Sequence, residues 1–148
     1  MTQNSQLIEI LMAEDSPEDQ LIAEQAIKSS KLINRVHTVG DGEEVLAFLK
    51  REGSFANAPQ PDLILLDVNM PRMSGLEALA EIKKHPQWKY IPVVILTSSD
   101  ADRDVYAAYG HHANCYIVKP IDFARFIEVV KSIESFWFGV VKLPPKRI

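Results

Sequence analysis

The run Leu63–Leu66, followed directly by Asp67, constrains the fold of this chain more than any other feature. Four consecutive aliphatic residues after Pro61 and Asp62 predict a strand buried on both faces, as the strands of a parallel sheet are. In an open parallel sheet, ligands bind just beyond the carboxyl ends of the strands. Asp67 is therefore expected at the edge where functional groups gather, although an acid that closes a strand can also simply cap the next helix.

Polar residues also follow three other apolar runs, which read as strands. The runs and the residues after them are Ile8–Ala13 before Glu14 and Asp15, Val93–Leu96 before Thr97, and Tyr116–Val118 before Lys119. Two acids, a hydroxyl and an amine thus join Asp67 at strand ends. A lone lysine is usually an ordinary surface residue, but its place after a buried strand favours a functional role.

Helical signals alternate with these strands along the whole chain. Caps, acidic first turns or apolar residues at helical spacing predict helices over 17–29, 41–49, 75–84, 100–109 and 121–137. Asp41 and Glu44 have the spacing of a capping box at the start of the second of these helices. The β-branched run Arg35–Val39 predicts one more strand. Five strand–helix units predict an α/β, doubly wound fold with one parallel sheet. The strand order 2-1-3-4-5 is a common solution, and it would place Glu14 and Asp15 beside Asp67.

Length and composition exclude several classes of function. The 148 residues suit one domain, and 47% hydrophobic with 24% charged residues is ordinary for a globular protein. A net charge of -4 argues against nucleic-acid binding, which needs a basic face. A single cysteine, Cys115, suits the reducing cytoplasm. There is neither a signal peptide nor an apolar run long enough to span a membrane, so we expect a cytoplasmic protein.

The strand-end residues permit phosphoryl transfer. Carboxylates that converge in one crevice repel one another, so a hard cation such as Mg²⁺ is expected there. An aspartate beside Mg²⁺ can act as the nucleophile that forms an aspartyl-phosphate. Lys119 would neutralise a phosphate oxygen, and Thr97 could donate its hydroxyl to the same group. His111 and His112, in the turn before the fifth strand, are more simply explained as solvated residues than as zinc ligands.

With these residues in place, the chain resembles the receiver domain of two-component response regulators, a family with a flavodoxin-like fold. The resemblance covers residues 7 to about 137 and leaves 138–148 as a tail. It implies a metal site of Glu14, Asp15, Asp67 and the backbone carbonyl of Asn69, a phosphoacceptor at Asp67, catalytic roles for Thr97 and Lys119, and a switch formed by Thr97 and Tyr116. Thr97 follows Asp67 by 30 residues and Lys119 follows Thr97 by 22 residues, as in the family.

The resemblance implies a signalling module rather than a turnover enzyme, phosphorylated by a sensor histidine kinase. The loop Gly53–Pro61 and the aromatic C-terminal segment resemble the small stand-alone response regulators of cyanobacterial phytochromes. Glu14 departs from the family, because an aspartate is more usual there. The resemblance also places Asn69 and Ser99 at positions that tune phosphate lifetime in the family.

Two other functions compete with this one. A phosphatase of the haloacid dehalogenase kind also uses strand-end Asp, Thr and Lys residues. It needs its nucleophile after the first strand and a second aspartate two residues later, where this chain has Asn69. A degenerate receiver that only binds partners is the second alternative. The intact acid pair, phosphoacceptor, hydroxyl and lysine argue against it.

The expected output is a surface, because residues 138–148 are too few to fold independently. We define the C-terminal face as the fourth helix (100–109), fifth strand (115–118) and fifth helix (121–137). It would carry Tyr106, Tyr109 and Tyr116, and residues 136–138 are three consecutive aromatics that one helical stripe cannot bury. We expect a homodimer through this face and an unidentified downstream protein. The alternative is a monomer whose tail covers Trp137.

Overall fold

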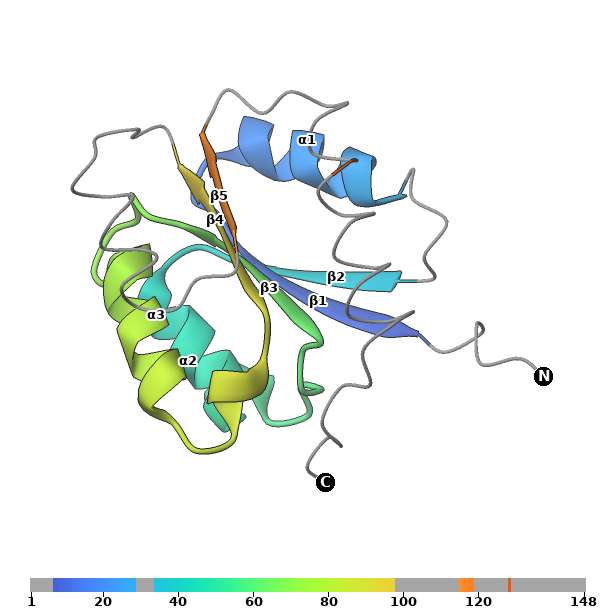
Figure 1. Ribbon diagram of the computed structural model, residues 1–148. Helices are drawn as coiled ribbons and strands as arrows, with labels where there is room; N and C mark the ends of the chain where they lie inside the picture. The colour runs from blue at the N-terminus through green and yellow to red at the C-terminus, as the bar shows by residue number, and fades with distance from the viewer. Residues whose placement is uncertain (1–6, 29–33, 98–114, 119–127, 129–148) are drawn as a thin grey trace.

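A parallel β-sheet forms the centre of the computed structural model, which describes residues 7–28, 34–97, 115–118 and 128 (Figure 1). Its strands are β1 (Ile8–Ala13), β2 (Asn34–Val39), β3 (Leu63–Asp67), β4 (Val93–Thr97) and β5 (Cys115–Val118). They are arranged in the order β2-β1-β3-β4-β5, and every neighbouring pair is parallel. The flavodoxin-like parallel sheet and the predicted order of the first four strands are confirmed.

Helices lie on both faces of the sheet. The helix α1 (Pro17–Lys28) lies on one face, and α2 (Gly42–Lys50) and α3 (Gly75–Lys84) lie side by side on the other (Figure 1). Two short 3₁₀ turns that the sequence did not predict are η2 (Gly53–Phe55) and η3 (Trp88–Tyr90). The predicted helices at 100–109 and 121–137 lie outside the described residues. Within the described ranges, no helix is long and apolar enough to cross a membrane.

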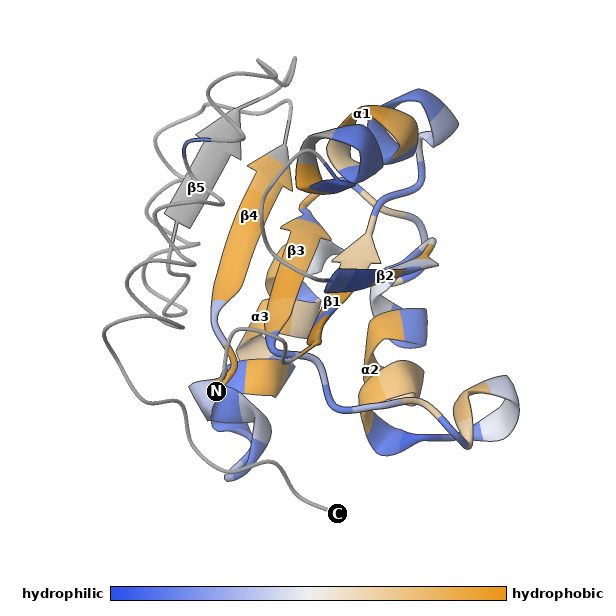
Figure 2. Cartoon of the chain, turned by 90° about the vertical axis from the view of Figure 1, so that its right-hand side faces the viewer, coloured by the Kyte–Doolittle hydropathy of each residue, from blue (hydrophilic) through white to orange (hydrophobic). Residues whose placement is uncertain are grey.

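The core has two layers because successive strand residues point to opposite faces. Leu11, Ile64 and Ile95 are fully buried and pack in one cluster with residues of α2 and α3 such as Phe48 and Leu79. The residues between them in each strand are also buried, on the face that α1 covers. β3 and β4, at the sheet centre, are accordingly hydrophobic over most of their length (Figure 2). The strand ends are therefore fixed by packing on both sides.

The connection from α3 to β4 is fixed by polar contacts. His85 adopts an extended conformation before Pro86, which ends α3 as the sequence predicts. The Lys83 ammonium donates to the carbonyls of Lys89, at 3.0 Å, and Ile91, at 2.7 Å, and so ties η3 to α3. Burial lowers the pKa of Lys83 to about 8. These contacts set where the chain enters β4.

Gly75 allows α3 to begin directly against the end of β3. Its N–H donates to the carbonyl of Val68 at 3.0 Å, and a Cβ at this position would lie 2.0 Å from the Asp67 carbonyl oxygen. The preceding Ser74 caps α3, since its hydroxyl accepts from Glu77 N–H while the Glu77 carboxylate accepts from Ser74 N–H. The start of α3 therefore fixes the backbone position of Asp67.

We predict that Gly75→Ala destabilises the protein by about 3 kcal/mol, because the new methyl group must displace the Asp67 backbone. Gly40→Ala is the matched control, since a Cβ there meets only the flexible Glu44 carboxylate at 3.5 Å. Its effect should stay within about 0.5 kcal/mol. Urea unfolding of the two variants measures both values. Equal stabilities would show that the close approach at Gly75 is not a constraint.

Candidate functional site

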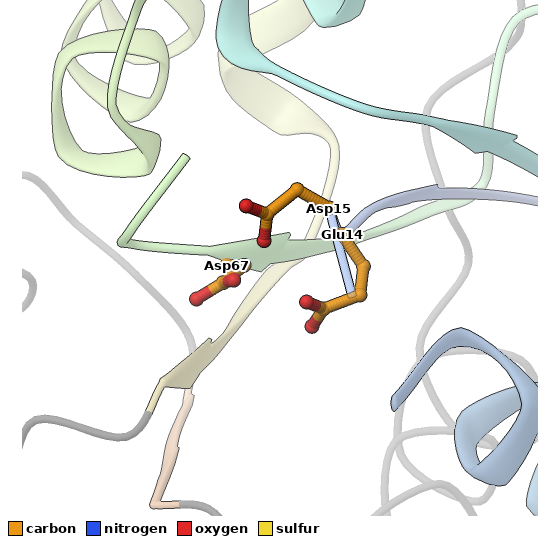
Figure 3. A group of neighbouring side chains, drawn as sticks. All are labelled: Glu14, Asp15 and Asp67. Carbon is orange, nitrogen blue, oxygen red and sulfur yellow. The ribbon is translucent and has the colours of Figure 1, made fainter. Parts of the chain in front are cut away.

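Three carboxylates meet at the carboxyl ends of β1 and β3 (Figure 3). Glu14 and Asp15 directly follow β1, and Asp67 is the last residue of β3. Ala13 pairs with Leu66 in the sheet, so the residues after them leave the two strands at the same level. One carboxylate oxygen from each acid lies within 4.8 Å of the others. Glu14 and Asp67 are buried, whereas Asp15 is exposed.

Backbone donors orient the two buried carboxylates. Ser16 N–H donates to Glu14 Oε2 at 3.1 Å, and Asn69 N–H donates to Asp67 Oδ1 at 3.2 Å. The Glu14 main chain is held as well, because its N–H donates to the Val39 carbonyl at 3.0 Å and extends the pairing of β1 with β2. Both acids are thus held by the turns that follow their strands.

This group of ligands fits a hard divalent cation. Carboxylates that lie this close repel one another, and burial of two of them strengthens the repulsion. All the donor atoms are oxygens, and the group contains no histidine or cysteine that would favour zinc. Mg²⁺ usually takes one or two carboxylates and keeps several waters, which the exposed side of Asp15 leaves room for. The residues present therefore fit Mg²⁺.

The other predicted site residues lie on neighbouring strands or just beyond them. Thr97 ends β4, which adjoins β3, and its main chain pairs with Val118 at the end of β5. Its side chain lies outside the described part of the chain. Tyr116 is on β5, where its main chain pairs with Ile95. Lys119 follows Val118 and lies outside the described residues. The roles of these residues remain predictions.

An ion pair beside this site was not predicted from the sequence. Asp41 was expected only as a helix cap, which it is, because its Oδ1 accepts from Glu44 N–H at 2.9 Å. Its Oδ2 in addition receives the guanidinium of Arg72, from the loop that follows Asp67. The Glu44 side chain accepts from Gly40 N–H rather than from Asp41 N–H, so the predicted capping box is modified. The two partners are 31 residues apart, and no spacing rule connects them.

Comparisons with known proteins agree with this geometry. Residues 10–131 match the family described as response regulator receiver domain. The chain is 43% identical to the response regulator Rcp1 of Synechocystis sp. over 135 residues, which is 91% of this chain and 92% of Rcp1. It is 32% identical to the probable methanogenesis regulatory protein FilR2 of Methanothrix harundinacea over 136 residues, covering 91% and 86% of the two chains.

Solved structures of response regulators are also similar to this chain. The phosphorylated cyanobacterial phytochrome response regulator RcpA superimposes with a TM-score of 0.83 at 42% identity, over 95% of this chain and 100% of that one. The Mn²⁺-bound form of Rcp1 gives a TM-score of 0.80 at 42% identity, over 93% and 99% of the chains. The residues matched by the family span β1 to β5 and include all three clustered acids. This chain therefore belongs to the response regulator receiver domain family.

Proposed function

We propose that the chain is a phosphorylation-switched response regulator in which Asp67 accepts a phosphoryl group from a sensor histidine kinase. The observation that carries this proposal is the meeting of Glu14, Asp15 and Asp67 at one edge of the sheet. Membership of the receiver family and similarity to response regulators of phytochromes support it. The kinase is accordingly proposed to be a phytochrome. The protein acts as a signalling component and not as a turnover enzyme.

In the proposed reaction, a carboxylate oxygen of Asp67 attacks the phosphorus of a kinase phosphohistidine. A P–O bond forms, the P–N bond breaks, and the imidazole leaves with the electron pair of that bond. Asn69 N–H holds the carboxylate in one orientation, which favours an in-line attack. Mg²⁺ held by Glu14, Asp15, Asp67 and the Asn69 carbonyl would neutralise charge on the transferred group. Lys119 and the Thr97 hydroxyl are assigned to the phosphoryl oxygens.

The proposed output starts at the same phosphoryl group. Thr97 moves toward the phosphoryl oxygens and vacates space, into which the Tyr116 ring turns. This changes the C-terminal face, through which the protein contacts a second copy of itself and a downstream protein. We further infer one cytoplasmic receiver domain over residues 1–148, with the complete five-stranded (βα)₅ arrangement. A receiver that only binds partners, or a phosphatase, would give different results in the experiments that follow.

We predict that Asp67→Asn abolishes phosphorylation, because the amide keeps the shape of the side chain but is not a nucleophile. Incubation with acetyl phosphate and Mg²⁺, followed by intact mass measurement, should show one added phosphoryl group on the wild type and none on Asp67→Asn. Asp62→Asn is the matched control, since Asp62 is a buried acid before the other end of β3. It should be phosphorylated like the wild type. An equal mass gain in Asp67→Asn would refute the assignment.

We predict that Thr97→Ala is still phosphorylated but transmits the change weakly. In protein with ¹³C-labelled tyrosine, phosphorylation should shift the Tyr116 ring signal in the wild type, and by clearly less in Thr97→Ala. Thr38→Ala is the control, because the Thr38 hydroxyl lies on β2 and donates to Glu24 instead. A full shift in Thr97→Ala would disprove the coupling of Thr97 with Tyr116.

We predict a homodimer through the C-terminal face. The support is the number of aromatic residues that the sequence places there, since aromatic side chains are common interface anchors. Light scattering at micromolar concentration should give the mass of two chains, and Tyr109→Ala should lower that mass. Tyr90→Ala is the control, because Tyr90 is an exposed tyrosine on η3, outside this face. A strict monomer, with and without phosphate, would contradict the dimer.

A further inference from the structure

The loop between β3 and α3 carries a charged residue in a strained conformation. Arg72, five residues after Asp67, has a φ of 63°, in the left-handed region that residues with a side chain seldom adopt. Among the described residues that are not glycine, only Arg51 shares this feature, with a φ of 59°. Arg51 ends α2, where a left-handed residue is a common helix terminator. Arg72 terminates no helix, so its conformation needs another explanation.

The explanation is a buried partner. The Arg72 guanidinium contacts Asp41 Oδ2, and the Asp41 side chain is completely buried. A buried carboxylate that loses its cationic partner is costly, so Asp41 holds Arg72 firmly. Arg72 Nε also lies 3.5 Å from Glu43 Oε1, but both side chains are about 60% exposed, and a pair of this kind contributes little. Asp41 is therefore the anchor.

The next residue ties the loop to the same place. The Met73 carbonyl accepts from Gly42 N–H at 3.0 Å, and a Cβ on Gly42 would lie 2.7 Å from that oxygen. Asp41 and Gly42 together form the beginning of α2. The loop that follows the phosphoacceptor is thus fixed at two points to the N-terminus of another helix.

Between this attachment and β3 lies the part of the loop that faces the carboxylates. Asn69 donates its N–H to Asp67 Oδ1, and its carbonyl is the proposed fourth metal ligand. The other end of this stretch is fixed by the hydrogen bond from Gly75 N–H to the Val68 carbonyl. With both ends fixed, the Asn69 backbone has one position relative to Asp67. We call the two contacts with the start of α2, Arg72 with Asp41 and Gly42 N–H with the Met73 carbonyl, the clamp. Without the Arg72 contact, the Gly42–Met73 hydrogen bond alone ties the loop to α2.

We infer that Arg72, anchored on buried Asp41, is a positioning residue that holds the Asn69 backbone in place for the cation and for the Asp67 carboxylate. This rests on the proposed function, since it assigns a role within the same metal site. Partners that orient metal ligands from outside typically change affinity by about 10–100-fold when they are removed.

Electrostatics alone makes the opposite prediction. Arg72 is a cation in the loop next to a site for a cation, so its removal should raise Mg²⁺ affinity if charge is all that matters. Positioning requires that Arg72→Ala lowers this affinity instead. The sign of the change therefore separates the two explanations.

The experiment measures Mg²⁺ binding to the full chain by titration calorimetry. Arg72→Ala should raise the Kd by about tenfold. Arg51→Ala is the matched control, because it makes the same substitution at the same backbone conformation, and among the described residues Arg51 forms no ion pair. It should keep the wild-type Kd and lose less stability on thermal unfolding than Arg72→Ala, which also leaves the buried Asp41 carboxylate without its cation. An unchanged or lower Kd in Arg72→Ala would overturn the inference.

Two further measurements distinguish positioning from a general loss of structure. Phosphorylation of Arg72→Ala by acetyl phosphate should be slow at low Mg²⁺ and return to the wild-type rate at saturating Mg²⁺. Asp41→Asn keeps the cap of α2, because asparagine caps as well as aspartate, but it removes the charge that holds Arg72. Adding Arg72→Ala to Asp41→Asn should change the Kd by less than it does in the wild type. Additive effects would overturn the pairing.

Amide hydrogen exchange in metal-free protein tests the clamp separately from the proposed function. Exchange of the Asn69 and Gly42 amides should become faster in Arg72→Ala and remain unchanged in Arg51→Ala. If the wild type neither binds Mg²⁺ nor gains a phosphoryl group, the proposed function fails, while the exchange rates still decide whether the clamp exists. If the wild type does both and Arg72→Ala exchanges like Arg51→Ala, the clamp is refuted.

Discussion

Repulsion among Glu14, Asp15 and Asp67 is the constraint on which the rest of this structure depends. Two of the three carboxylates are buried, and one oxygen from each of the three lies within 4.8 Å of the others. A chain that only needed a stable core would place apolar or neutral residues there, because like charges at this distance oppose folding. Neighbouring backbone N–H groups offset part of this cost, and a bound cation would offset more. The arrangement of the acids therefore favours the binding of a cation.

Packing of the sheet offsets the destabilisation that the clustered carboxylates cause. β1 and β3 are buried on both faces, by α1 on one side and by α2 and α3 on the other (Figure 1). Their ends therefore stay in place even though the groups attached to them repel. The close approach of Gly75 to the Asp67 carbonyl adds a steric limit, because the backbone of Asp67 cannot move without moving α3. Packing rather than polar pairing keeps the acids together.

The parts of this arrangement that follow from periodicity and topology were predictable from the sequence. An aliphatic run that ends in Asp67 gives a buried strand, and a parallel sheet brings all strand ends to one edge, so the grouping of Glu14, Asp15 and Asp67 needed no coordinates. The pairing of Asp41 with Arg72 was not predictable. It joins two loops 31 residues apart and depends on a left-handed residue that is not glycine, which no local rule selects. The two 3₁₀ turns were not predicted either, because three residues are too few to show a hydrophobic period.

The fixed position of the loop after Asp67 determines which side of the site could move after phosphorylation. Asp67 itself is fixed by β3 and Gly75, and the loop up to Met73 is fixed to the start of α2. When Asp67 carries a phosphoryl group, the backbone on this side of the site would then keep its position. In the proposed scheme the response has to come from the other side, where Thr97 ends β4 and Tyr116 lies on β5. In the same scheme, the rigidity proposed to position the ligands would also direct the change toward the C-terminal face, because a switch needs one fixed side against which the other can move.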